Sequence, residues 1–588
     1  MNPKVKALQE RIRAARGEIP ARLVLKNARV VNVFTGGVDQ KDVAVHNGFI
    51  AGLSSHYEGE EEVDLEGRWV VPGLIDGHIH MESTLLMPPE LSKALLPHGT
   101  TTLVCDPHEI ANVMGLEGLD RLMRESRGVA LDFFFMAPSC VPATPLETSG
   151  HALHAADLAT LKKKPRILGL AEMMNFPGVV AGEEEVLEKI VLFQDALLDG
   201  HAPALGGKDL QAYLAAGIRS DHEAIRGSEA LEKLAGGMVI MIREGSTAKN
   251  LEALVPRITP LNARRFMFVS DDLHAEDIRK RGHLNFMFCK AVQMGLDPLT
   301  ALRLVTLNPA EYFGFKDRGA VAPGFRADLI VLDHFETFRI VSVYKDGEKA
   351  VEAGESLPAS CPPTEPLSTI SRGLNVAPLT PEAFRLPHPG GKARVMEIVP
   401  GQIQTTERHE SVPSENGFVA VDTERDILKL FVVERHRASG RIGLGLVNGF
   451  GLKQGVLASS IAHDAHNIIG VGVRDEDILT AVEALKRMGG GLIAVRDQKI
   501  LSHLPLEFGG LMTRMPLPRV VRRLEHLKQT ASAMGCPLSE PFMALSFLAL
   551  PVIPHLKLTD RGLVDVDRFE IVPLFMEEAP EGGPHHAS

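Results

Sequence analysis

Cysteine is scarce in this chain of 588 residues, which carries five scattered cysteines and no Cys-x-x-Cys pair. A disulfide framework and a thiolate zinc site are therefore excluded, and a reducing cytoplasm is the expected compartment. No apolar run reaches the roughly 18 residues that a membrane span needs. The first residues, "MNPKVKALQERIRAARGE", are polar and helix-prone and lack the apolar core of a signal peptide.

Clusters of basic residues are also missing. The net charge is −12 and the two signs are interspersed, which argues against nucleic acid as the main partner. The glycine-rich run "GLGLVNGFGLKQG" does not end in the Lys-Ser/Thr of a phosphate-binding loop, and turns explain it well enough. These absences give no indication of nucleic acid or a membrane as a partner.

The length predicts two or three domains rather than one. Short β-branched runs lie on both sides of a central region in which strand-like and helix-like stretches alternate. A proline-rich stretch and a further mixed region follow. The predicted organisation is a helical extension at 1–20, a small β-sandwich domain from 21–71 plus 316–355, a barrel at 72–315, a linker at 356–392 and an α+β domain at 393–588.

The central region contains eight apolar, strand-like runs, each followed by a helical stretch. They are "GLIDGHIH", "TTLVCD", "DFFFMAP", "ILGLAE", "LLDGHAP", "GIRSDHE", "MVIMIREG" and "RFMFVSDD". Eight is the count for a (β/α)8 barrel, and continuous rather than alternating hydrophobicity fits parallel strands covered by helices. A doubly wound open sheet has the same periodicity, so the pattern alone leaves it as an alternative.

Most of these runs end in a side chain that can bind a metal ion. Because active sites of such barrels lie at the carboxyl ends of the strands, these side chains are predicted to meet at one mouth. Two of the histidines lie two residues apart in one strand and so point to the same side. The predicted ligands are His78, His80, Glu172, His201, His222 and Asp271.

Nitrogen and oxygen ligands without thiolate suit iron, manganese or zinc in a catalytic site. Four imidazoles and two carboxylates exceed the needs of one ion, whereas two ions about 3.5 Å apart, bridged by a carboxylate, would use them all. Any one of these histidines, taken alone, would be an ordinary hydrogen-bonded residue. The convergence favours a binuclear centre, with Mn²⁺ or Fe²⁺ first and Zn²⁺ as the alternative.

Longer strings carry a resemblance. "PGLIDGHIH" with a later "SDD" is similar to the amidohydrolase superfamily. The chain resembles the bacterial-type adenine deaminases in "HIHMEST", "CDPHEIANVMG", "MAPSCVPAT", "GLAEMMNFPGVV", "GKDLQAYLAAGIRSDHE", "REGSTAKNL" and "LASSIAHDAHNIIGVG". The similarity runs from about residue 20 to 575. It implies hydrolysis of adenine to hypoxanthine and ammonia, in purine salvage, by a homodimer or homotetramer.

The resemblance assigns the six metal ligands to the residues named above. Glu172 stands where many superfamily members have a carbamylated lysine, and it offers a bridging carboxylate without carbon dioxide. In the implied reaction a hydroxide attacks C6 of adenine while a carboxyl group protonates N1. Asp271 is the expected acceptor of the water proton. The candidates for meeting the ring nitrogens are Glu82, Glu109 and Glu223, for which salt bridges or helix caps are equally good explanations.

Three further residues are predicted near the substrate. Pro138 and Ser139 are expected to line the pocket, and Asp272 to orient a histidine or the substrate, with a helix cap as the alternative. In "IAHDAHN", the side chains of His463, Asp464 and His466 would cap the site, bind an extra ion or serve the fold.

Two other functions stay open at the level of sequence. A different binuclear amidohydrolase, acting on another aminopurine, a pyrimidine or a cyclic amide, would have the same ligands. A non-catalytic barrel that serves as a binding module would have lost some of them, and all six are present.

Overall fold

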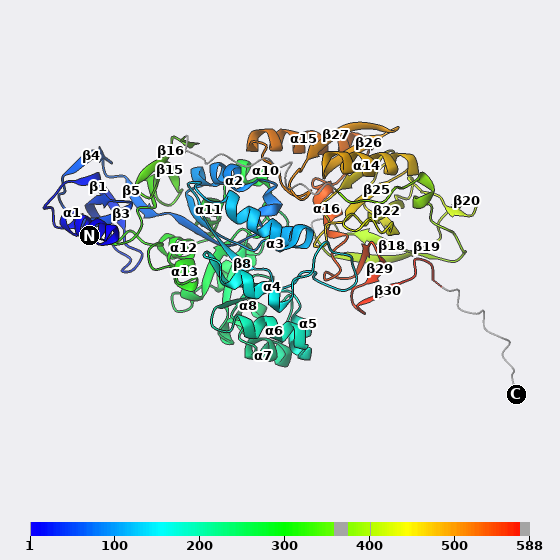
Figure 1. Ribbon diagram of the computed structural model, residues 1–588, viewed down its shortest axis with the longest axis horizontal. Coiled ribbons are helices and arrows are strands. Elements are labelled where there is room, and N and C mark those ends of the chain that lie inside the picture. Colours follow the sequence, from blue (N-terminus) through cyan, green and yellow to red (C-terminus); the bar gives the residue numbers. More distant parts are fainter. Residues whose placement is uncertain (1, 358–373, 400–401, 577–588) are drawn as a thin grey trace. The chain divides into compact units, whose positions relative to one another are not determined.

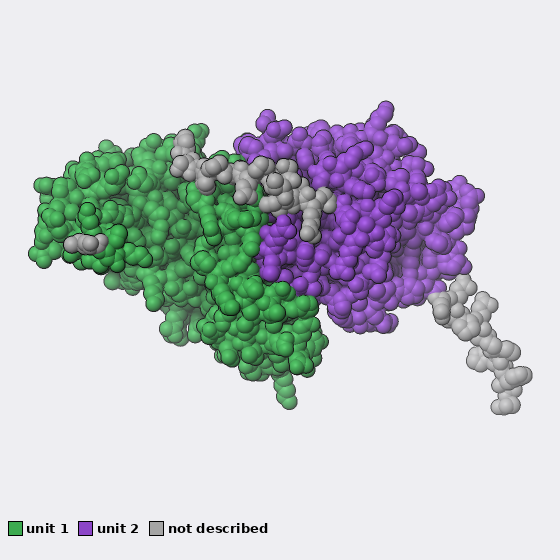
Figure 2. Space-filling view, viewed as in Figure 1, with its two compact units in different colours: residues 1–107, 120–139, 154–364 green, residues 108–119, 140–153, 365–588 purple. Residues whose placement is uncertain are grey.

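The computed structural model describes residues 2–357, 374–399 and 402–576. The chain forms two compact units, coloured separately in Figure 2. Unit 1 comprises residues 1–107, 120–139 and 154–364, and unit 2 comprises 108–119, 140–153 and 365–588. Much of the predicted linker at 356–392 lies outside the described residues.

Unit 1 contains a barrel of eight parallel strands, in a five-stranded and a three-stranded group. Figure 1 labels one of these strands, β8, beside helices of the same unit. Backbone hydrogen bonds join the two groups at both ends. The N–H of Arg219 donates to the carbonyl of Leu198 at 3.2 Å, and the N–H of Asp271 donates to the carbonyl of His78 at 3.0 Å. This closure confirms the (β/α)8 barrel and excludes the open sheet. The strands are β6 (Leu74–Ile79), β7 (Thr100–Cys105), β8 (Asp132–Ala137), β9 (Ile167–Met173), β10 (Leu197–Gly200), β11 (Ser220–Asp221), β12 (Val239–Arg243) and β13 (Phe266–Val269).

Apolar side chains fill the barrel. One buried cluster combines residues of β7, β8, β9, β12 and β13 with Phe313. Gly77 of β6 lies against this cluster, and a Cβ there would come within 2.7 Å of the sulfur of Met267. The glycine between Asp76 and His78 thus lets the ligand-bearing strand approach the filled interior closely.

Helices follow the barrel strands. Within α3 (His108–Glu125) the backbone kinks at Gly115, whose φ is 58°. The others are α2 (Pro88–Leu95), α4 (Ala155–Lys162), α5 (Phe176–Ala181), α6 (Glu184–Leu192), α7 (Gly207–Ala215), α8 (Gly227–Ala235), α9 (Leu251–Leu254), α10 (Ala275–Arg281), α11 (Leu284–Gln293), α12 (Pro298–Leu304) and α13 (Leu307–Tyr312).

Strands from both sides of the barrel sequence form one nine-stranded sheet in unit 1. The two sets meet where β5 pairs antiparallel with β14, with Val71 opposite Ile330. Helix α1 (Pro3–Ala15) precedes the sheet. The strands are β1 (Ala21–Val31), β2 (Val38–His46), β3 (Phe49–Ser54), β4 (Gly59–Asp64), β5 (Trp69–Pro72), β14 (Leu329–His334), β15 (Arg339–Lys345), β16 (Glu348–Glu352) and β17 (Glu355–Ser356).

Unit 2 has an α+β fold built on an eight-stranded sheet. The sheet consists of β18 (Ala393–Ile398), β19 (Thr405–Glu410), β22 (Leu428–Val433), β23 (Ile442–Asn448), β24 (Val456–Ser459), β25 (Ile468–Gly472), β26 (Gly491–Arg496) and β27 (Lys499–Pro505). Two short pieces, β20 (Ser414–Glu415) and β21 (Phe418–Val419), form a hairpin. The remaining elements are α14 (Asp475–Met488), α15 (Leu517–Ala533), α16 (Pro541–Phe547), β28 (Leu556–Thr559), β29 (Gly562–Asp565) and β30 (Glu570–Val572).

No helix among residues 2–357, 374–399 and 402–576 has the length and apolar character to cross a membrane.

Candidate metal centre

The six predicted ligands meet at the carboxyl ends of the barrel strands in unit 1. Five of them are buried, with exposed fractions of 4% or less, and His201 is half-buried. In one half of the cluster, Nε2 of His80 lies 3.2 Å from Nε2 of His78 and 3.1 Å from Oδ1 of Asp271. In the other half, Nδ1 of His201 lies 3.3 Å from Nε2 of His222. Ligand atoms around an ion with bonds of about 2.1 Å would be spaced similarly.

Glu172 lies between the two halves. Its Oε1 is 3.3 Å from Nε2 of His80, while its Oε2 is 2.7 Å from Nδ1 of His201 and 3.1 Å from Nε2 of His222. One carboxylate oxygen therefore faces each half. This is the arrangement that a bridging carboxylate requires, and it arises because Glu172 lies near the carboxyl end of β9, between β6 and β11 on the barrel mouth.

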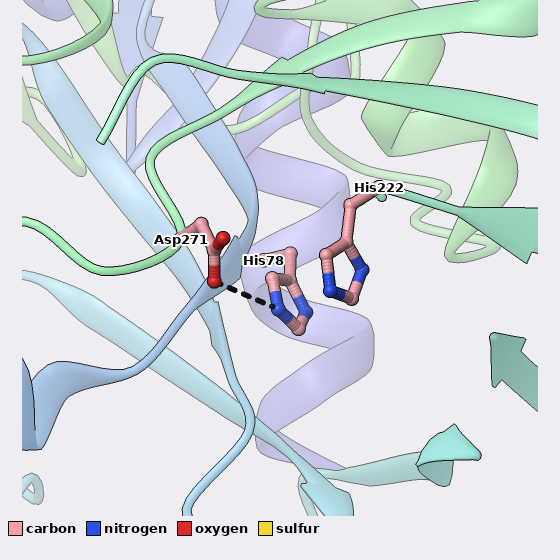
Figure 3. Close-up of side chains that lie close together, drawn as sticks. All are labelled: His78, His222 and Asp271. Atoms are coloured by element: carbon pink, nitrogen blue, oxygen red, sulfur yellow. Dashed lines mark ion pairs between the residues drawn. The ribbon is translucent and has the colours of Figure 1, made fainter. Parts of the chain in front are cut away.

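Asp271 follows β13 and closes the ring against β6. Its φ of 57° is unusual for a residue other than glycine. Backbone hydrogen bonds hold this conformation, because its N–H donates to the carbonyl of His78 and its carbonyl accepts from His80. Figure 3 shows the result: the carboxylate of Asp271 faces His78, whose ring stacks on that of His222 with centroids 4.3 Å apart.

The hydrogen bonds of His80 test whether a cation fits here. Its Nδ1 lies 3.0 Å from the backbone carbonyl of Asp106, which can only accept, so this nitrogen carries the proton of the neutral ring. In the neutral ring, which is the form that binds a metal ion, Nε2 then presents a lone pair to the space it shares with the carboxylates of Glu172 and Asp271. Three electron-rich groups converging on one point are stabilised by a cation, and the donor set therefore fits a divalent transition metal.

The titration behaviour of the histidines agrees with a site that attracts cations. Burial alone would lower the pKa of His80, but hydrogen bonds with Asp271 and Glu172 raise the pKa well above its ordinary value. The pKa of His201 and that of His222 are also raised, against the effect of burial, by the carboxylates around them.

Arg243, at the end of β12, is a site residue that the sequence analysis missed. It is buried, and its guanidinium donates to Oδ2 of Asp271 at 2.8 Å and makes two hydrogen bonds with the carboxylate of Glu223. Burial would raise the pKa of Glu223, but Arg243 holds it below its ordinary value. The signal was present in "REGST", where a charged residue ends an apolar strand at the barrel mouth.

Replacement of Arg243 by methionine is expected to leave the buried carboxylates of Asp271 and Glu223 without their arginine partner. The free energy of unfolding should fall by about 3–5 kcal/mol, the usual cost of removing one partner of a buried ion pair. Urea denaturation measures this loss. Arg257→Met is the control, because this exposed arginine should change stability by less than about 0.5 kcal/mol. Equal losses in the two variants would contradict the role of the Arg243 pairs.

The other predicted catalytic carboxylates have different surroundings. Glu82 is buried in the 3-10 turn Met81–Thr84, directly after His80. Glu223 has both oxygens engaged by Arg243, which argues against a part in proton delivery. The expected contact of each with a ring nitrogen stays a prediction.

The predicted substrate-binding residues are held from within unit 1. The hydroxyl of Ser139 donates to the carbonyl of Glu172 at 2.5 Å, so it supports the bridging residue. Pro138 is buried next to it. Asp272 accepts a hydrogen bond of 2.5 Å from the hydroxyl of Ser83, so the structure gives its carboxylate a partner in the turn after β6.

Glu109 lies in unit 2 with the histidines of "IAHDAHN". Its Oε1 is 3.4 Å from Nδ1 of His463 and its Oε2 is 3.8 Å from Nε2 of His466. Nδ1 of His466 accepts from the backbone N–H of Ala462 at 3.3 Å, so Nε2 carries the ring proton and is a donor facing Glu109. Asp464 lies beside them, 3.7 Å from His463. The side chains of Glu109, His463 and His466 lie close enough to hold an ion between them, so an extra ion and a structural cluster both remain predictions for "IAHDAHN".

Comparison with known proteins identifies similar chains. The profile of the amidohydrolase family matches residues 69–350, and that of the adenine deaminase C-terminal domain matches residues 402–570. The adenine deaminase of Desulfatibacillum aliphaticivorans is 50% identical over 566 residues, which cover 96% of this chain and 99% of that protein. "Adenine deaminase 2" of Carboxydothermus hydrogenoformans is 45% identical over 571 residues, 97% of this chain and 100% of that protein. Among solved structures, the β-aspartyl dipeptidase of Fervidobacterium islandicum AW-1 aligns with a TM-score of 0.45 and 18% identity, over 57% of this chain and 98% of that chain.

Proposed function

Because this chain belongs to the adenine deaminases within the amidohydrolase family, we propose that it hydrolyses adenine to hypoxanthine and ammonia. The observation that supports this most directly is Glu172, whose two oxygens face opposite halves of one buried cluster. A barrel that served only as a binding module would not need this cluster. The proposed cofactors are two divalent ions. Mn²⁺ or Fe²⁺ is favoured, and Zn²⁺ is the alternative.

In this proposal His78, His80 and Asp271 would hold one cation, His201 and His222 would hold the other, and Glu172 would contribute to both. When bound, the cations lower the pKa of a water molecule and so supply a nucleophile near neutral pH. The protein contributes a fixed geometry, because hydrogen bonds to the backbone hold both Asp271 and His80 in place.

Two carboxyl groups share the proton transfers. Asp271, which Arg243 holds through Oδ2, accepts the water proton and passes it to the exocyclic amine, which then leaves as ammonia. Attack on C6 places negative charge on N1 of the ring, so an acid must deliver a proton there before ammonia leaves. With Glu223 engaged by Arg243, Glu82, in the turn after His80, is the candidate within unit 1 for this acid.

Ammonia release from four substrates tests the proposed function. Purified protein loaded with Mn²⁺ or Fe²⁺ is incubated with adenine, guanine, cytosine and adenosine in parallel. We expect adenine to give the highest kcat/KM, by at least about 100-fold, since a pocket that pairs with one set of polar groups rejects rings lacking them. Glu172→Ala protein prepared in the same way controls for contaminating deaminases. A better substrate among the other three would assign the chain to a different deamination.

Purine salvage in the cytoplasm, a homodimeric or homotetrameric state, and the absence of nucleic acid and membrane partners are parts of the same proposal. Sparse cysteine, dispersed charge and the small substrate support them.

A further inference from the structure

We propose that Lys233 is a positioning residue that fixes the loops carrying His201 and His222 and thereby sets the affinity of one half of the metal centre. This inference rests on the proposed binuclear centre and concerns a residue that touches neither the ligands nor the substrate.

Lys233 lies in α8 with a fully buried side chain. Its Nζ donates to three acceptors: the carbonyl of Ala202 at 2.7 Å, Oδ2 of Asp221 at 2.9 Å and Oε1 of Glu229 at 2.8 Å. An ammonium group has three protons, so its donors are all used. A lysine is almost never buried completely unless it is paired in this way.

The partners of Lys233 are the neighbours of two ligands in the chain. Ala202 follows His201 directly, and Asp221 directly precedes His222. Oδ1 of Asp221 also accepts from the N–H of Ala202 at 3.0 Å, and Oδ2 accepts from that of Ala224 at 3.0 Å. The loops after β10 and β11 are therefore joined to each other by one carboxylate, which Lys233 holds and neutralises.

Glu229 extends the connection. Its Oε1 accepts from the N–H of Ala204 at 3.0 Å as well as from Lys233. The loop that begins at His201 is thus attached to α8 at two points, through Ala202 and through Ala204. Because the short loop positions the imidazole of His201 through its own backbone, a displacement of this loop moves Nδ1 away from Oε2 of Glu172, now 2.7 Å distant.

The other half of the centre is held differently. His80 is oriented by the carbonyl of Asp106, and the backbone around His78 is fixed by Asp271. None of these contacts involves Lys233. Loss of the ammonium group should therefore weaken metal binding selectively at the site of His201 and His222. Substitution of a residue that supports metal ligands typically lowers metal affinity or activity by about 10–100-fold.

The test is a metal titration of Lys233→Met, which keeps the aliphatic stem and removes the charge. Apoprotein of the wild type and of the variant is titrated with Mn²⁺, and bound metal per chain is measured together with the electron paramagnetic resonance signal of a coupled pair. We expect two ions in the wild type. In the variant we expect one ion at ordinary affinity, a second bound about 10–100-fold more weakly, and loss of the coupled signal.

Lys345→Met is the matched control. Lys345 is also buried, and its Nζ lies 3.0 Å from carboxylates of both Asp328 and Asp132, but it belongs to the flanking sheet. This variant should lose stability and still bind two ions. If both variants lose metal in proportion to their loss of thermal stability, Lys233 has only a structural role and the proposal fails.

If Lys233→Met does not fold, Lys233→Arg provides the test. Arginine keeps the charge but cannot place three protons at the position of one Nζ, so we expect folded protein with a weakened second site. Wild-type affinity for both ions in this variant, or in Lys233→Met, would overturn the proposal. Wild-type protein that binds two ions yet leaves adenine intact would refute the proposed function alone, because the affinity comparison would still be readable.

Discussion

Glu172→Ala is expected to abolish turnover of adenine and to release metal at the same time. The reason is geometric: each carboxylate oxygen faces a different half of the centre, so one substitution removes a ligand from both. Substitution of a residue that only supports a ligand lowers metal affinity or activity by up to about 100-fold, and loss of the shared ligand should lower them further. Metal per chain and the rate of ammonia release are measured on the same preparation.

Two variants sharpen this test. Glu172→Gln keeps the size of the side chain but has one oxygen, so it should retain at most one firmly bound ion. Glu125→Ala removes another buried carboxylate of unit 1, which pairs with Arg121 at 2.9 Å, and it should lose stability while keeping both ions. Full turnover by Glu172→Ala would contradict the bridging role.

Removal of the metal is also expected to reduce adenine turnover strongly. Dialysis against a chelator should reduce adenine turnover by about 100-fold or more, because no side chain in the cluster can replace the nucleophile that the cations supply. Addition of Mn²⁺ or Fe²⁺ should restore turnover, and Mg²⁺ should not, since imidazole nitrogens suit the transition metals and not this hard ion.

Thermal unfolding gives an independent measurement of the same binding. A ligand at 100 times its Kd stabilises the folded state by about 2.7 kcal/mol, so the Tm of the apoprotein should rise with Mn²⁺ concentration. Glu172→Ala should show a much smaller rise. Chelated protein that turns over adenine at the original rate would exclude metal from the mechanism.

The sequence predicted the barrel because its signal is repeated. Eight apolar runs were recognisable one by one, and the structure has a strand in each, from β6 to β13. The positions of the ligands followed from the strands without further information. In a closed ring of parallel strands every carboxyl end lies at the same mouth, so residues as distant in sequence as His78 and Asp271 must come together.

The pairings within the site were not predictable in this way. Glu223 was expected near the ring nitrogens, and the structure pairs it with Arg243 from the next strand. Ser139 was expected to face the pocket, and its hydroxyl bonds to the backbone of Glu172. Such partners depend on the direction in which each side chain leaves its strand and on the curvature of the barrel, and neither leaves a pattern in the sequence.

By itself, the sequence determined the type of fold, the chemical nature of the ligands and the edge of the barrel at which they gather, because hydrophobic periodicity and residue type are local properties. Only the tertiary structure decided that Glu172 faces both halves of the cluster, that Arg243 holds Asp271, and that Lys233 joins two ligand loops. These are distances of a few ångströms between residues far apart in the chain, and they are set by closure of the barrel and packing of its helices.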